Sequence, residues 1–183
     1  PYHGKEKKCK YSITYPEYLT GSKYFKCEEK AVKDDYCIYH HPTYWENNQN
    51  KIEVSLHNKI KKLDAKGEDL ICIGYNLTNL SLSNYTFKHQ VLFNNAKFHD
   101  KITFNNVTFS DRADFSRASF NSDISFEKCI FLDYSIFTRC TFKKGVIFRE
   151  LLFEKRSLFT YAQFEDEVEF FSAVFNSNAI FID

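Results

Sequence analysis

The chain has 183 residues, a length that suits one core or one core with a small appendage. Its formal net charge is +1 at pH 7, and 18% of its residues are aromatic. No apolar run approaches the roughly 20 residues that a membrane-spanning helix requires, so the sequence predicts no span of a bilayer. Residues 1–71 mix 13 Lys with 11 acidic residues, and this mixture argues against strong binding to nucleic acid through a basic stripe.

The first 43 residues contain the pattern expected of a small metal-binding head. Cys9, Cys27 and Cys37 are followed by His40 and His41. Three thiolates and one imidazole form a ligand set that suits tetrahedral Zn²⁺, whereas a disulfide would leave one of the three cysteines unpaired. A head with few aliphatic residues also needs such a staple in order to fold. We therefore predict a structural Zn²⁺ site at Cys9, Cys27, Cys37 and His40, with His41 as the alternative fourth ligand.

The stretch from Asp35 to His40 reads DYCIYH and resembles the end of a small plant Cys3His module that is credited with DNA binding. The resemblance favours His40 over His41 as the fourth ligand. This chain departs from the module in its longer first spacing, and PTYWENNQNK stands where the module has a dense basic tail. We therefore expect a structural zinc knuckle here.

Residues 44–70 are predicted to form a capping and connecting helix. Leu56, Ile60 and Leu63 follow the i, i+4, i+7 spacing of an apolar helical stripe, and Gly67 is a natural stop. We expect this stripe to cover the first coil of the region that follows. The alternative is a helix that lies on a membrane surface, because the lysines suit it although the apolar face is weak.

The remaining residues, 71–183, repeat a unit that reads small-x-Phe. Its phenylalanines are spaced alternately by five and six residues, and a small or aliphatic residue stands two positions before each of them. The series consists of Phe93, Phe98, Phe104, Phe109, Phe115, Phe120, Phe126, Phe131, Phe137, Phe142, Phe148, Phe153, Phe159, Phe164, Phe170, Phe175 and Phe181. Neither a helix nor a long strand has this period, but a solenoid of very short strands and corners does. Four sides per coil would stack residues that are 22 apart, and the frame continues upstream at Cys72, Leu77, Leu82 and Phe87.

This repeat resembles the pentapeptide-repeat family, whose units carry a central Phe or aliphatic residue and a small residue two positions before it. The resemblance implies an all-β solenoid, a right-handed quadrilateral β-helix. The extra residue at every second corner departs from the simplest pattern, and we expect a local bulge there. Cys72, Cys129 and Cys140 fall within the frame and are expected to be small buried residues.

The sequence predicts no catalytic and no cofactor-binding residues. Enzymes built on β-helices place their sites on long loops. From Phe87 to Phe181 the repeat leaves no connecting loop longer than one of its corners. His89 and His99 are expected to point outward and alone. The acidic group at 165–169 is read as a solvated face.

We therefore expect a non-enzymatic scaffold or protein-interaction domain whose partner is another protein or a second copy of the chain, bound at the end of the rod. The alternatives are a nucleic-acid-binding module that uses the Lys-rich head and a cytoplasmic sensor or assembly domain of a channel-like membrane protein. A three-thiolate zinc site suits a reducing compartment, which favours the cytoplasm. Asn-x-Ser/Thr triplets at Asn76, Asn79, Asn84 and Asn106 leave a glycosylated, secreted chain open. The chain begins at Pro1 and stops in mid-repeat, so we expect it to be a fragment of a longer protein.

Overall fold

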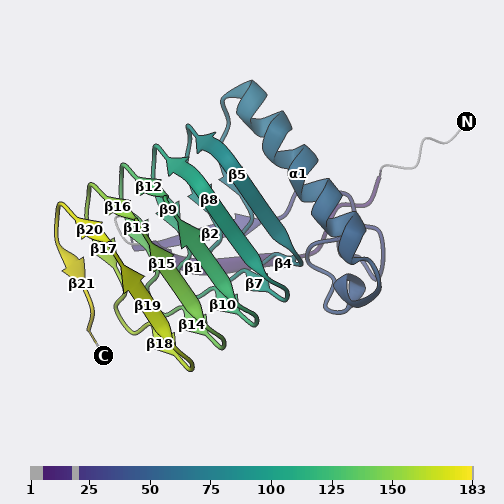
Figure 1. Cartoon of the computed structure of the whole chain (residues 1–183). Helices are drawn as coiled ribbons and strands as arrows, with labels where there is room; N and C mark the ends of the chain where they lie inside the picture. The colour runs from purple at the N-terminus through teal and green to yellow at the C-terminus, as the bar shows by residue number, and fades with distance from the viewer. Residues whose placement is uncertain (1–5, 18–20, 183) are drawn as a thin grey trace, which may run out of the picture.

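The computed structural model describes residues 6–17 and 21–182, which form a β-solenoid of about five coils with one helix and a small N-terminal head (Figure 1). The fold class predicted from the repeat is therefore confirmed. All strands of the solenoid pair in parallel with strands one coil away. The backbone groups of each short strand therefore form hydrogen bonds with the neighbouring coils.

The solenoid has four sides. The first side contains β3 (Leu70–Ile71), β6 (Val91–Leu92), β9 (Ala113–Asp114), β13 (Ser135–Ile136), β17 (Ser157–Leu158) and β21 (Ala179–Ile180). The second contains β4 (Asn76–Leu77), β7 (Lys97–Phe98), β10 (Ser119–Phe120), β14 (Thr141–Phe142) and β18 (Gln163–Phe164). The third and fourth sides are joined in β5 (Leu80–Phe87) and β8 (Ile102–Phe109), and are then separate as β11 (Ile124–Glu127) and β12 (Ile130–Phe131), β15 (Val146–Arg149) and β16 (Leu152–Phe153), and β19 (Val168–Phe171) and β20 (Val174–Phe175).

The register between coils agrees with the predicted stacking. Phe126 lies beside Phe104 on one coil and Phe148 on the next, a step of 22 residues. On the first two sides the step between the first and second coils is 21, since Leu70 pairs with Val91 and Asn76 with Lys97. The shorter step matches the plain five-residue spacing at the start of the repeat.

The core consists of four columns of stacked phenylalanine rings. Successive rings within a column are separated by 4.6–5.6 Å between centroids and are stacked with small interplanar angles. Rings of opposite columns meet edge to face, as Phe126 and Phe137 do at 6.0 Å and 86°. Such offset and edge contacts stabilise aromatic pairs beyond the area that they bury. Cys72, Cys129 and Cys140 are buried in this core, as the frame predicted.

The corners of the solenoid show a regular backbone pattern. Within the solenoid, non-glycine residues with positive φ recur every 11 positions, each in a corner that corresponds to a five-residue step of the repeat. The six-residue corners, where we expected a bulge, carry none of these left-handed residues among the described positions. The left-handed set consists of Asn84, Asn95, Asn106, Arg117, Lys128, Arg139, Glu150, Tyr161 and Ser172.

A helix covers the first coil, as predicted. The 3-10 turn η1 (Tyr44–Asn47) leads into α1 (Gln49–Lys66), which ends at Gly67 with φ 67°. The apolar stripe Ile52, Leu56 and Ile60 is buried within the same core cluster as the solenoid, while Val54 on the other face is about half exposed. Figure 1 shows α1 alongside β5, at the end of the stack of coils opposite β21. Among the described residues, none of the helices has the length and apolar character needed to cross a membrane.

The head extends past the first coil and packs against the side of the solenoid. Its antiparallel hairpin, β1 (Ser12–Glu17) and β2 (Gly21–Lys26), lies along the first side, where Tyr15 packs on Ile73 and Leu92. At the far end of β1, Glu17 accepts a hydrogen bond of 2.7 Å from Arg112, and both side chains are buried. The hairpin therefore spans several coils, which no periodic feature of the sequence indicated.

Candidate metal centre

The structure brings Cys9, Cys27, Cys37 and His40 together in one buried cluster. Their ligand atoms all lie within 4.8 Å of one another, although the residues come from three separate segments of the head. Cys9 precedes β1, Cys27 follows β2, and Cys37 and His40 share one turn in which the His40 N–H donates to the Cys37 carbonyl. Backbone hydrogen bonds from Cys9 to Glu29 and from Cys27 to Tyr11 hold the segments side by side.

The spacing of the ligand atoms suits a tetrahedral ion. The sulfurs of Cys27 and Cys37 are 3.8 Å apart, and Nδ1 of His40 lies 3.3 Å from the sulfur of Cys37 and 3.7 Å from that of Cys9. Four ligands at the Zn–S distance of about 2.3 Å would place neighbouring sulfurs about 3.8 Å apart in a tetrahedron. The donor set and its spacing are thus compatible with a metal site.

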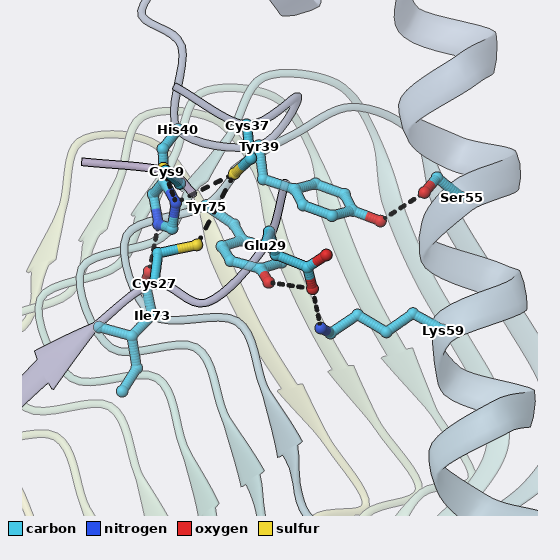
Figure 2. A network of polar contacts seen from close by, with 10 residues as sticks. All are labelled: Cys9, Cys27, Glu29, Cys37, Tyr39, His40, Ser55, Lys59, Ile73 and Tyr75. Atoms are coloured by element: carbon cyan, nitrogen blue, oxygen red, sulfur yellow. Dashed lines mark hydrogen bonds and ion pairs between the residues drawn. The ribbon is translucent and has the colours of Figure 1, made fainter. Parts of the chain in front are cut away.

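The orientation of His40 is set by a second hydrogen bond (Figure 2). Its Nε2–H donates to the carbonyl oxygen of Ile73 at 2.8 Å, so the lone pair of Nδ1 faces the three sulfurs. An outer hydrogen bond of this kind is the usual way in which a ligating histidine is oriented. The ring of Tyr11 is stacked on His40 at 3.8 Å and 8°, and Tyr75 meets it edge-on at 5.0 Å.

His41, the alternative ligand of the sequence analysis, faces away from this cluster. Its Nε2 lies 3.0 Å from the carboxylate of Asp34, and its Nδ1 accepts a hydrogen bond from the backbone N–H of Thr43. The hydrogen bond from His41 is the first cause of the lowered pKa of Asp34. His41 therefore braces the turn that carries His40.

The three thiols influence one another. The hydrogen bond from Cys27 is the main reason why the pKa of Cys37 is lowered, while the hydrogen bond to Cys37 and burial raise the pKa of Cys27. Burial is the main reason why the pKa of Cys9 is raised. Buried sulfurs this close together disfavour three negative charges unless a cation lies between them.

A polar network ties the cluster to the helix and the first coil (Figure 2). The carboxylate of Glu29 lies 2.5 Å from Nζ of Lys59 and 3.5 Å from the hydroxyl of Tyr75. Tyr39 donates to Ser55 at 2.8 Å, and its ring is stacked on Tyr75 at 4.2 Å. Sequence reasoning missed these tyrosines, because their partners lie on other elements and no motif links them.

His99 was expected to point outward and alone, and it does not stand alone. Its ring is stacked on Trp45 of η1 at 3.6 Å and 7°, and its Nε2–H donates to Asn76 Oδ1 at 3.0 Å. Asn76 also donates from its side chain to the Tyr39 carbonyl at 3.1 Å and is buried. This contact fastens the start of the helical segment to the second side of the solenoid.

The comparison with protein families agrees with the repeat. A family model described as pentapeptide repeats (9 copies) matches residues 104–151, which lie within the solenoid. Searches of the curated proteins and of the solved structures gave no match.

Proposed function

Because this chain carries a solenoid of the pentapeptide-repeat family, we propose that it acts as a non-enzymatic scaffold, a rigid rod whose head is stapled by zinc. The regular parallel stacking supports this role, since each coil contacts only its neighbours and the rod presents flat, repeating faces to a partner. Proteins of this family are generally structural or interaction proteins rather than enzymes.

Zinc in the head is the first part of this proposal. The observation that carries it is the tetrahedral spacing of Cys9, Cys27, Cys37 and His40, with His40 oriented by Ile73. When bound, the ion would draw its ligands from three segments and would neutralise the thiolates that burial alone disfavours.

The zinc proposal is tested by metal analysis of the purified, reduced chain. We expect one zinc per chain, and we expect Cys37→Ser to release it while the β-sheet circular dichroism of the rod is kept. Cys129→Ser is the matched control, because Cys129 is equally buried but belongs to the Phe core. Absence of metal from the unmodified protein, or equal loss in the two variants, would falsify the site.

The contact surface is the second part of the proposal. The last coil exposes an apolar layer in which Phe181 and Ile182 are each more than half exposed and Phe170 and Phe171 are also accessible. We propose that a second copy of the chain packs against this layer, because exposed apolar patches and unpaired strand edges favour association.

Sedimentation at several protein concentrations tests this contact. The unmodified chain should associate in a concentration-dependent way, and replacing Phe181 and Ile182 together by Ser should abolish the association. Leu132→Ser is the control, since Leu132 is exposed to a similar degree on the flank of the rod. A chain that stays monomeric throughout, or that loses association equally in the control, contradicts this assignment.

A further inference from the structure

A hollow of about 460 Å³ lies between the head and the second side of the solenoid. The head contributes Tyr11 and Tyr36 to its lining, and the solenoid contributes Asn95, Lys97, Arg117 and Ser119. Its size falls in the range of sites that hold small organic ligands. Neither the repeat nor the metal cluster accounts for this combination of side chains.

The charge of the hollow is positive. Among the described residues that line it there are two cations, Lys97 and Arg117, and no carboxylate. A third cation stands near the rim, where Nζ of Lys10 lies 4.4 Å from the centre of the Tyr36 ring. Four other hollows on the described part of the chain each include at least one Asp or Glu. Cations gathered in a concave surface attract an anion more strongly than isolated surface cations do.

The solenoid arranges the polar residues of the hollow as a two-by-two array. Lys97 and Ser119 are partners in the pairing of β7 with β10, so they are neighbours on successive coils. Asn95 and Arg117 occupy the left-handed corners just before these strands, and the Asn95 N–H donates to the Ser116 carbonyl at 2.9 Å. Neighbouring coils are separated by the strand spacing of about 4.8 Å, which is close enough for side chains of two coils to contact one tetrahedral anion.

Lys97 and Arg117 are available for a ligand. Within the described parts of the chain, neither forms an ion pair, and the side chain of Ser119 is engaged only as a donor to Asn121 at 3.0 Å. The serine oxygen can therefore still accept, and the guanidinium and ammonium groups keep their donors. A guanidinium fork and an ammonium group side by side are the usual protein donors to phosphate oxygens.

We propose that this hollow binds a small phosphate ester, with its phosphate between Lys97 and Arg117 and its organic part against Tyr11 and Tyr36. The phosphate oxygens accept hydrogen bonds from the two cations and neutralise their charge. The tyrosine rings offer a surface for a planar or apolar group. His40, one of the proposed metal ligands, also lines the hollow, while the two cations that would bind the phosphate belong to the solenoid. Such binding goes beyond the scaffold role, because the rod would then respond to a metabolite at the junction of its two parts.

Isothermal titration calorimetry with adenosine monophosphate tests the site on the full chain, with adenosine as the uncharged counterpart and inorganic phosphate as the bare anion. We expect the monophosphate to bind, adenosine not to bind, and the affinity to fall as salt is raised. Arg117→Gln and Lys97→Gln should each weaken binding about tenfold, as expected for loss of one charge-assisted contact. Arg117→Lys should restore part of the affinity.

Lys128→Gln is the matched control, because Lys128 occupies the equivalent left-handed corner two sides away and is also exposed. Equal weakening in this control would show only general charge attraction and would overturn the site. Absence of binding by both phosphate probes at millimolar concentration would overturn it as well, as would binding of an RNA oligonucleotide that outcompetes them. Arg117→Gln should leave the zinc content unchanged, so failure here is distinct from failure of the metal proposal.

Discussion

Phe126 shows what one ring contributes to the solenoid. It is fully buried and stacked between Phe104 at 5.0 Å and Phe148 at 5.6 Å. Phe126→Ala removes a ring from the middle of a column, so we expect it to lower the free energy of unfolding by about 3–5 kcal/mol. The neighbouring Glu127→Ala should change it by less than about 0.5 kcal/mol, since that side chain is half-buried and points outward. Urea unfolding of the two variants measures the difference, and equal losses would contradict the assigned frame.

Gly74 matters for the docking of the head. It has φ 69°, and a Cβ placed on it would lie 2.0 Å from the hydroxyl of Tyr11, the residue stacked on His40. Gly74→Ala should therefore displace Tyr11 and loosen the head, beyond the about 1–2 kcal/mol that a left-handed alanine costs by itself.

Gly21→Ala is the control that separates the backbone strain of Gly74→Ala from its clash with Tyr11. Gly21 also has positive φ, but nothing lies within 4 Å of its Cβ position. Limited proteolysis should cleave the head of Gly74→Ala faster than that of Gly21→Ala. Equal cleavage rates in the two variants would mean that Tyr11 does not hold the head to the first coil.

At the scale of elements, η1 is fastened to the second side by the stack of Trp45 on His99. Burial is the main reason why the pKa of His99 is lowered from its usual value to about 4, and Lys97 contributes. In an unfolded chain this pKa is about 6.5, so the unfolded state binds the proton more readily. The stabilising neutral form is fully present above pH 6.5, and its contribution is lost as the pH falls toward 4.

We therefore expect the free energy of unfolding to decrease between pH 6.5 and 4 by about 1–2 kcal/mol from this group, less than the full shift because the side chain is only half-buried. His99→Phe keeps a ring against Trp45 and should show a shallower decrease over the same range. Fluorescence of Trp45, the single tryptophan of the chain, reports the unfolding. Parallel pH profiles for the two proteins would count against the assignment to His99.

The elements that could be predicted are those whose surroundings repeat. Every Phe of the series has the same neighbours one coil away, so the spacing alone predicts its place, and the helix follows from an apolar stripe and a terminal glycine. The docking of the head could not be predicted in this way. Glu17 and Arg112 are 95 residues apart, and Trp45 and His99 meet across two unrelated elements. The four proposed ligands were found because their chemistry is unusual enough to stand out without any knowledge of the fold.

At the scale of the whole molecule, the two ends of the solenoid differ. The first coil is covered by α1, and the hairpin β1–β2 lies across it and the following coils. Among the described residues, the coil with β18, β19, β20 and β21 has a neighbouring coil on one side only. In a stack of this kind stability is a sum of contacts between neighbours. The last coil therefore has the smallest share of them.

The unequal ends give the rod a direction of local opening. Coils should separate one at a time from the β21 end, because each departure exposes only one further layer of rings, whereas opening from the other end would first have to detach α1 and the hairpin. Amide hydrogen exchange under native conditions should then be fastest in β18–β21, slower in β14–β17, and slowest in β6–β10. A uniform rate along the rod would mean that the coils open together, as one cooperative unit.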